Sequence, residues 1–421
     1  MNLLERIAAG QFKKTGAVKK LSISGQPNNT NNTYEVFSIP LDYLYYNDQN
    51  GRINTAYKQY QASHGRITPE AGNSEYNSIF QKLVYESNPQ ALKDTLQSIK
   101  EKTQQEPGVI LPDGRVIDGN RRFTALRMYQ EDSGISKNFE TVVLSLDSRT
   151  DKKTIKELEL DLQLGQEARV DYDPIDRIFN VYDTIELEKL MTVEEYRNAS
   201  GAGNTRGINR DLRLAHLILR FLNLVSPGSH DEQADKFYLA RELKLDGPIE
   251  EIERTLSSME DSDKESITDA VLVSLAAEKA SGEQRPSTLV MRDIKTNILQ
   301  KPDILKYYLD AVDDRVDAIS EAFQETPIKS ASDLKAVVSA DTELKNQIDK
   351  MKNSTNRLVY KGKVDSKRKR ALSILQDIEG KLDELKPADF AELTTDENYT
   401  AKEVLSEIND ILFKLKRDLN A

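Results

Sequence analysis

The segment from Val109 to Gln130 constrains the fold most strongly, because it encodes a hairpin that runs directly into a helix. Val109–Leu111 and Val116–Ile117 are apolar runs joined by Pro112-Asp-Gly-Arg115, a turn sequence. Asp118-Gly-Asn-Arg-Arg122 then leads into Phe123–Gln130, whose apolar spacing is helical. A strand that passes through a glycine turn into a helix predicts a small α/β core around this segment.

Further strands and helices are predicted on both sides of this segment. Strands are expected over 36–39 and 141–146, where β-branched and apolar residues cluster. Helical patterns occupy 41–46, 79–85, 90–102, 152–164 and 174–190. Residues 35–170 are therefore expected to form a small mixed α/β domain, and the fold class of the whole chain is expected to be α+β, with a mostly helical C-terminal half.

The first 34 residues are expected to form a flexible basic arm. Lys13, Lys14, Lys19 and Lys20 precede Gln26–Thr33, a polar run without a helix or strand pattern. These lysines either contact a nucleic-acid backbone or are solvated on a mobile tail, and solvation is the more ordinary outcome.

Residues 171–230 contain a candidate helix-turn-helix. Thr192–Arg197 opens with the capping pattern Thr-x-x-Glu, a Gly-Ala-Gly-Asn turn follows, and Ile208–Leu224 carries an apolar stripe. Arginine and asparagine are the residue types that read guanine and adenine edges in the major groove. The candidate DNA-binding residues at the start and on the polar face of the second helix are Arg206, Asn209, Arg210 and Arg213. The alternative is a solvated face on a helix packed through its leucines.

Residues 231–421 are expected to form an acidic, all-helical domain. Residues 1–230 hold 29 basic and 30 acidic residues, whereas 231–421 hold 30 and 40, so most of the net charge of −11 lies after residue 230. Apolar steps of three and four over 371–385 and 404–415 predict an antiparallel helical hairpin, which is either a homodimer interface or an intramolecular core. The densest basic run, Lys361–Arg370, either contacts phosphates or balances the acidic helices.

Composition narrows the available chemistry. The chain has no cysteine, which excludes disulfides, thiolate metal sites and cysteine-dependent redox chemistry. Its three histidines, His64, His216 and His230, are scattered, which argues against a histidine-based metal or nuclease centre. No run of about 18 apolar residues and no apolar secretory segment is present, so a cytoplasmic protein without a membrane partner is expected.

The box Asp118-Gly-Asn-Arg-Arg122 has the residue types of an anion site. Glycine lets backbone N–H groups approach a ligand, and two guanidinium groups follow at the start of a helix, so phosphate is the natural ligand. The alternative is that Asp118 and the arginines form a structural ion pair beside the hairpin. The five residues alone favour neither.

Four segments in order resemble the N-terminal half of ParB-type partition proteins. Ile39–Ile53 is similar to the opening strand, short helix and Asn/Pro/Arg box of that family, and Asp118–Leu126 is similar to its double-arginine box, preceded by a helix at 92–100. Leu160–Leu164 with Asp173–Asp176 resembles the Glu-Asn-x-Gln-Arg segment and the Asn-Pro-x-Glu after it, and Met191–Val225 lies where the family has its helix-turn-helix. The resemblance spans about residues 36 to 225, roughly half of the chain.

The resemblance implies a ParB/sulfiredoxin-like fold that binds CTP, or another nucleoside triphosphate such as ATP, together with Mg²⁺. Carried over to this sequence, Asn47, Asn50 and Arg52 frame the ligand, Gly119, Asn120, Arg121 and Arg122 hold phosphates, and Asp161 with Gln163 faces the metal. The partners it implies are DNA and nucleotide, with a homodimer for which the C-terminal helices are a candidate interface.

The sequence departs from the ParB pattern at three places. Leu160-Asp161 replaces the Glu-Asn pair, Leu164 replaces the arginine, and residues 53–90 look like an insertion. The box also resembles the Asp-Gly-Gln-Gln-Arg of NTP-dependent restriction and phage-defence proteins. Sulfiredoxin chemistry needs a cysteine and is excluded.

Three functions follow as hypotheses. The first is a nucleotide-regulated, ParB-like DNA-binding protein of partition or regulation type. The second is an NTPase or phosphotransferase in which Asp118 acts on the γ-phosphate. The third is a non-catalytic interaction protein in which the box is structural.

Overall fold

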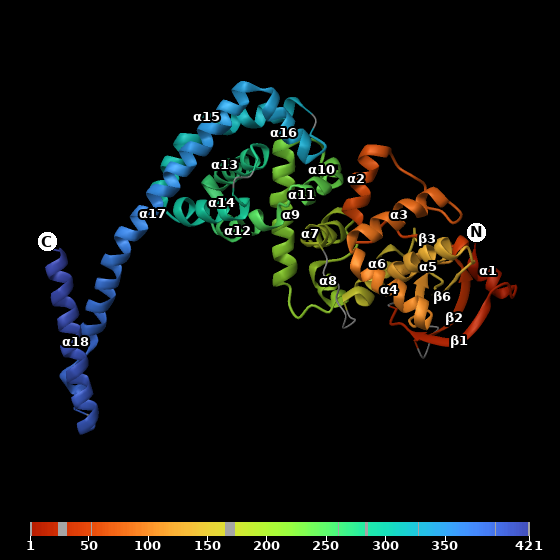
Figure 1. Cartoon of the computed structure of the whole chain (residues 1–421), viewed down its shortest axis with the longest axis horizontal. Helices are drawn as coiled ribbons and strands as arrows, with labels where there is room; N and C mark the ends of the chain where they lie inside the picture. Colours follow the sequence, from red (N-terminus) through yellow and green to blue (C-terminus); the bar gives the residue numbers. More distant parts are fainter. Residues whose placement is uncertain are drawn as a thin grey trace. The chain divides into compact units, whose positions relative to one another are not determined.

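The computed structural model describes residues 2–23, 32–51, 53–164, 173–259, 261–282, 285–326, 328–391 and 393–419. Two compact units divide the chain, Met1–Asn356 and Arg357–Ala421. The predicted α+β class is confirmed, since a mixed sheet near the N-terminus is followed by helices (Figure 1). Within the described residues, no helix is long and apolar enough to cross a membrane.

The sheet has six strands in the order β1-β2-β6-β4-β5-β3. Its strands are β1 (Lys13–Lys20), β2 (Thr33–Pro40), β3 (Tyr45–Tyr46), β4 (Gly108–Ile110), β5 (Arg115–Asp118) and β6 (Asn138–Val143). The pairs β1/β2, β2/β6 and β4/β5 are antiparallel, whereas β4/β6 and β3/β5 are parallel. The predicted hairpin over 109–117 is thus confirmed, while the predicted helix at 41–46 is a 3-10 turn, η1 (Leu41–Tyr43), followed by β3.

The prediction of a flexible basic arm is wrong for the described part of residues 1–34. Leu3 of helix α1 (Leu3–Ala8) is fully buried, and β1 pairs with β2 from Lys13 to Lys20 as an edge strand. Lysines suit an edge strand because their charge discourages pairing with another chain, so a lysine-rich stretch does not require disorder. Most of the polar run Gln26–Thr33 lies outside the described residues.

Helices cover both faces of the sheet, as the alternation of side chains along β2 requires. Phe37 and Ile39 face a cluster with α3 (Ser74–Ser87), α4 (Pro89–Lys102) and α5 (Asn120–Ser133). Val36 points to the opposite face, where it joins a cluster with α6 (Lys152–Leu164). The predicted insertion at 53–90 contains α3 and α2 (Asn54–His64), and Tyr57, Tyr76 and Phe80 from these helices are core residues.

Helix α9 (Arg206–Val225) is the central helix of the part that follows the sheet (Figure 1). It packs against α7 (Pro174–Tyr182), α11 (Phe237–Glu242), α12 (Asp246–Ser257), α13 (Asp261–Ala280) and α15 (Pro302–Glu325). The predicted boundary near residue 230 therefore does not separate two compact units, because helices from both sides of it share one core. The change in net charge near residue 230 is a property of the surface and does not mark a domain boundary.

The remaining helices of this part are short and closely spaced. A π-helical turn, η2 (Asp183–Leu187), extends α7 and is followed by α8 (Val193–Ser200), whose Thr192 and Glu195 form the predicted capping box. The others are α10 (His230–Asp235), α14 (Ser287–Ile294), η3 (Lys295–Leu299) and α16 (Ala331–Ala340).

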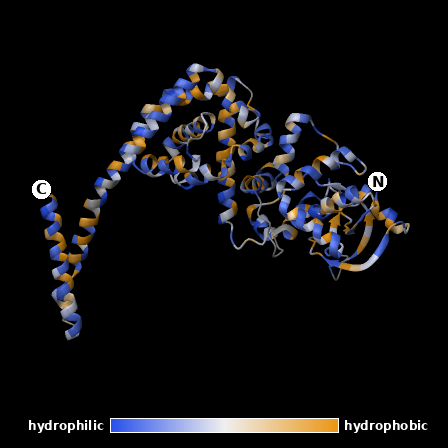
Figure 2. Cartoon of the chain, viewed as in Figure 1, coloured by the Kyte–Doolittle hydropathy of each residue, from blue (hydrophilic) through white to orange (hydrophobic). Residues whose placement is uncertain are grey.

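The unit 357–421 contains the C-terminal part of α17 (Thr342–Glu384), the 3-10 turn η4 (Pro387–Phe390) and α18 (Thr395–Leu419). The two helices double back on each other, as the apolar spacing predicted (Figure 1). Hydrophobic and hydrophilic residues alternate along both helices (Figure 2), and α18 has no buried residue among those described.

Candidate functional site

A cavity of about 640 Å³ lies beside the predicted box. Strand β5 ends at Asp118, Gly119 caps α5 in the left-handed conformation with φ +96°, and α5 starts at Asn120. A Cβ at position 119 would lie 2.9 Å from a ring carbon of Phe139. Glycine is therefore required here both by the positive φ and by the space. Gly119, Asn120, Arg121 and Arg122, the residues predicted to hold phosphates, all line the cavity.

The carboxylate of Asp118 is held by two cations. Lys19 Nζ lies 3.3 Å from Asp118 Oδ2, and Arg122 Nη2 donates to the same oxygen at 3.1 Å. Lys19 also donates to Pro107 O at 2.6 Å, and Arg122 Nη1 donates to Glu106 O at 2.5 Å. Asp118 and Arg122 thus form the structural ion pair that was the alternative to a phosphate site. Asp118 connects the box to β1 through Lys19, and Arg122 connects it to the loop before β4 through Glu106 O.

Asn120 carries an unsatisfied polar atom at this cavity. Its Oδ1 is buried and has no hydrogen-bond partner among the described residues. A buried acceptor without a donor is unusual in a folded protein, because the lost solvation is not replaced. The two ends of an amide side chain exchange places when it flips, so the unsatisfied atom is either an acceptor or a donor. In both cases the side chain can form one further hydrogen bond with a ligand, as acceptor or as donor.

Backbone strain lies on another wall of the same cavity. Thr103, the C-cap of α4, has φ 63° and ψ −175°, a combination that β-branched residues rarely adopt. It lines the cavity together with Gln104, Gln105 and Glu106. Strain of this kind persists only where surrounding structure fixes it, and it gathers at binding sites.

The two described residues of the predicted Asn/Arg box, Asn47 and Asn50, do not line the same cavity. Asn50 is buried and lines the cavity, whereas Asn47 does not line it and Arg52 lies outside the described residues. Asn47, 2% exposed, donates from Nδ2 to Glu159 Oε1 at 2.5 Å. Its Oδ1 accepts hydrogen bonds from the backbone N–H of Gln49 at 3.2 Å and from Arg115 Nη1 at 3.4 Å. Asn47 therefore holds the loop in place and does not reach the cavity.

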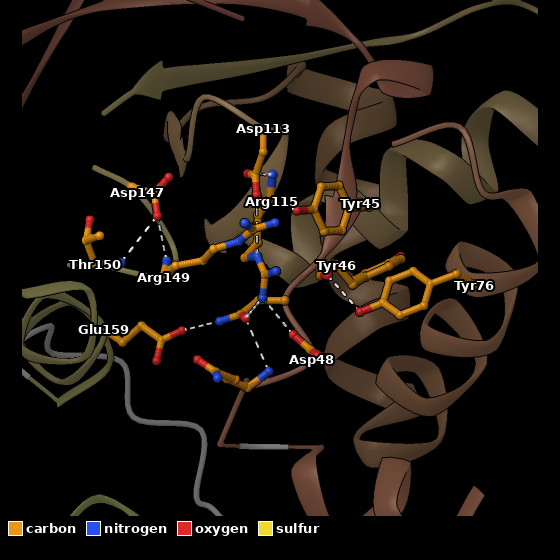
Figure 3. A network of polar contacts seen from close by, with 12 residues as sticks. Tyr45, Tyr46, Asp48, Tyr76, Asp113, Arg115, Asp147, Arg149, Thr150 and Glu159 are labelled. Carbon is orange, nitrogen blue, oxygen red and sulfur yellow. Dashed lines mark hydrogen bonds and ion pairs between the residues drawn. The ribbon is translucent and has the colours of Figure 1, made fainter. Parts of the chain in front are cut away.

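Arg115 is the centre of a polar network that the sequence did not indicate (Figure 3). Its guanidinium lies 2.7 Å from Asp48, 3.9 Å from Asp113 and 5.4 Å from the centre of the Tyr45 ring. Tyr45 donates to Asp113 at 2.6 Å, and burial together with this hydrogen bond raises the pKa of Tyr45. The sequence indicated only the hairpin turn around Asp113. The other members of the network, Tyr45 and Asp48, come from a segment far from this turn in the chain.

The metal-facing role predicted for Asp161 is not supported by its position on α6. Asp161 is exposed and does not line the cavity, whereas Leu162 does, and the side chain of Gln163 lies outside the described residues. The acid that α6 turns inward is Glu159, whose pKa is raised to about 7 because it is buried; nearby Lys156 acts in the opposite direction. Helical phase explains the error, since residues two positions apart point to different sides.

No group of three or more histidine or acidic side chains that could hold a metal occurs within the described ranges. The acidic residues that line the cavity are Asp94, Glu106 and Asp118. Mg²⁺ in nucleotide sites is usually held by phosphate oxygens, water and only one or two carboxylates. The donor set therefore fits a metal that arrives with a triphosphate and does not fit a metal bound by protein alone.

The four predicted DNA-binding residues separate into two pairs. Arg206 and Asn209 are exposed at the start of α9. Arg210 pairs with Glu250 at 2.9 Å, and Arg213 pairs with Glu253, both on α12. The second pair thus fastens α9 to α12, which sequence reasoning could not detect because the two helices are distant in the chain.

Comparisons with known proteins give little beyond this geometry. No protein-family model matches the chain, and no curated protein matches it. Among solved structures, it is similar to a Pnob8-like ParB-N domain with 13% sequence identity, over 62% of this chain and 94% of that one, at a TM-score of 0.29. This level of similarity carries no argument about fold or activity.

Proposed function

We propose that this protein binds a nucleoside triphosphate in the cavity beside α5, as the ordered resemblance to ParB-type proteins suggests. The observation that carries the proposal is the unsatisfied Asn120 Oδ1, which lies at the amino end of a helix and beside a cavity of about 640 Å³. A helix start offers backbone N–H groups and a positive dipole end to phosphate oxygens. A volume in the range of about 300 to 1,000 Å³ is typical of small-molecule sites.

The parts of the ligand are assigned to different residues. The amides at the start of α5 and the guanidinium of Arg121 take the phosphates, since charge-assisted bonds to phosphate are the strong ones. Asn120 takes one hydrogen bond from the sugar or the base. Asn50, which is buried and also lines the cavity, limits the size of the group that enters. CTP and ATP are both candidates.

Mg²⁺ bound with the triphosphate would neutralise part of its charge. Glu106 and Asp94 are the cavity carboxylates available to hold it, because Asp118 already accepts hydrogen bonds from Lys19 and Arg122. This arrangement favours nucleotide binding over hydrolysis by Asp118. Release of inorganic phosphate at a steady rate without DNA would favour the second hypothesis, an NTPase.

DNA binding and dimer formation complete the proposal. Arg206 and Asn209 are the exposed residues at the start of α9 that would contact DNA, and apolar side chains on α17 and α18 would pair with a second copy. Fluorescence anisotropy with duplex DNA tests the first part. Arg206→Ala is expected to weaken binding and to reduce its salt dependence. Equal affinity of the variant would show that α9 does not contact DNA.

Binding of radiolabelled nucleotides tests the central part. We expect CTP or ATP to bind in the presence of Mg²⁺ and Arg121→Ala to weaken binding by about tenfold or more, the effect of losing a charge-assisted hydrogen bond. Lys93→Ala is the matched control, because Lys93 is an exposed cation on α4 that does not line the cavity. Absence of binding by CTP, ATP, GTP and UTP would refute the proposal.

A further inference from the structure

A second cavity, of about 370 Å³, lies in the helical part of the first unit. It is formed where the first turn of α14 meets the segment after α11, the last turn of α13 and the start of α16. It shares no lining residue with the cavity beside α5.

The charge of this cavity is mainly positive. Lys244, Lys279 and Lys335 line it, and Glu242 is its only acidic lining residue among those described. Glu242 Oε2 accepts a hydrogen bond from the Ala331 amide at 3.1 Å, so this carboxylate is directed to the start of α16. Lys244 and Lys335 are exposed, and within the described ranges neither forms an ion pair. Two of the three cations are thus available to a ligand.

The start of α14 has unsatisfied backbone donors. Pro286 is the N-cap and supplies no side-chain hydrogen bond. The first amide to find a backbone acceptor is that of Leu289, which donates to Pro286 O at 2.9 Å. For the described residues, the amides of Ser287 and Thr288 have no acceptor. Two N–H groups therefore point out of the helix beside the lysines.

The side chain of Ser287 adds an independent observation. Ser287 is only 3% exposed, and it lines the cavity. Its hydroxyl makes no hydrogen bond to any residue that the structure describes. A hydroxyl that lines a cavity without a protein partner is free to donate to a ligand there, and a bound oxyanion would supply the acceptor.

Lys244 is held by an unusual backbone conformation. Its φ of 50° lies in the left-handed region, where lysine is uncommon. This conformation ends α11, since the backbone amide of Leu245 donates to Ala240 O at 3.0 Å, as in a common type of helix C-terminus.

From these features we propose a second ligand site at the start of α14, which binds a small phosphate or phosphomonoester between Ser287, Thr288, Lys244 and Lys335. The hydroxyl of Ser287 and the amides of Ser287 and Thr288 donate to the phosphate oxygens, and the lysines balance the charge. The site is independent of nucleotide binding beside α5.

Calorimetric titration of the full chain with inorganic phosphate and with pyrophosphate, in chloride buffer, tests this site. We expect saturable binding to the wild type. The double variant Lys244→Ser with Lys335→Ser should bind about tenfold or more weakly, and Ser287→Ala should bind several-fold more weakly. Lys306→Ser is the matched control, since Lys306 is an exposed lysine of α15 outside the cavity, and it should bind as the wild type does.

Three results would overturn the proposal. They are the absence of saturable binding, unchanged affinity in the double variant or in Ser287→Ala, and an equal loss of affinity in Lys306→Ser. Arg121→Ala separates the two cavities: it should leave phosphate binding intact, and loss of phosphate binding in that variant alone would assign the anion to the cavity beside α5. Melting curves of each variant without ligand confirm that it is folded.

Discussion

At the scale of single residues, Gly119 sets the geometry of the box. Its φ of +96° is unfavourable for any side chain, and a Cβ there would press on Phe139 and on Arg122. We expect Gly119→Ala to lower the free energy of unfolding by about 1 to 3 kcal/mol, as a left-handed position with steric contact implies. Gly203→Ala is the control, because a Cβ at that position would meet no atom within 4 Å. Urea unfolding measures both, and equal stability of the two variants would contradict this role of Gly119.

Glu159 makes a prediction about pH at the same scale. Burial raises its pKa to about 7 from 4.5, so the folded protein holds this proton more tightly than the unfolded chain does. Its contribution to stability is therefore fully present below about pH 4.5 and is lost as the pH rises through about 7. We expect Glu159→Gln to flatten this decline and to be the more stable protein above pH 7. The Gln side chain keeps an oxygen that can accept from Asn47.

Urea unfolding at several pH values between about 4.5 and 8 measures this effect. Glu157→Gln is the control, since Glu157 lies on the same helix and is only partly buried. A decline with pH that is the same in the wild type and in Glu159→Gln would exclude Glu159 as its source.

At the scale of elements, β1 is linked to the box by one buried cation. Lys19 is 9% exposed and contacts Asp118 and Pro107 O, whereas the neighbouring Lys20 is exposed. Lys19→Ala leaves Asp118 with one partner fewer and is expected to destabilise the protein by about 1 to 3 kcal/mol. Lys20→Ala should change stability by less than about 0.5 kcal/mol. Thermal unfolding compares the two, and similar effects would indicate that β1 contributes nothing through this contact.

Local sequence patterns predicted most elements of the sheet domain. The hairpin over 109–117, the helix after Arg122 and the helices at 90–102 and 152–164 follow from turn residues and periodicity, which act within a few residues. Strand β1 was not predicted, because a lysine-rich stretch is compatible with both a solvated tail and an edge strand. The 41–46 segment was ambiguous for a similar reason, since a short apolar run fits either a helix or a strand.

Apart from Asn50, which the resemblance indicated, the cavity residues named from the sequence are contiguous in the chain. Gly119 to Arg122 lie together by sequence, and they line one cavity. The pairing of Asn47 with Glu159 and of Arg213 with Glu253 depends on how distant elements pack, and no local pattern encodes it. The error at Asp161 has another cause, because residues two positions apart on a helix point to different sides.

At the scale of the whole molecule, the apolar stripes of the unit 357–421 remain exposed. Val404, Ile411 and Leu415 on α18 are each about half exposed, and Leu375 and Ile378 on α17 are more than a third exposed. Helices with such stripes normally bury them against another helix. A second copy of the hairpin would do so in a four-helix arrangement.

This arrangement predicts a change in oligomeric state. Wild-type protein is expected to sediment as a dimer, and Ile411→Asp to sediment as a monomer at the same concentration, because a charge in an apolar contact is unfavourable. Asn409→Asp adds the same charge to an exposed polar position of α18 and should leave the dimer intact. A monomeric wild type would show that α17 and α18 do not associate in this way.

Hydrogen exchange at the start of α5 gives the sharpest test of nucleotide binding in the cavity beside this helix. The first hydrogen bond of α5 is donated by Phe123 to Gly119 O at 2.8 Å, so the amides of Asn120, Arg121 and Arg122 precede the helical pattern. Addition of CTP or ATP with Mg²⁺ is predicted to slow exchange in peptides that cover 118–123. Nucleotide binding that leaves these amides unchanged while it protects another region would contradict the proposed site.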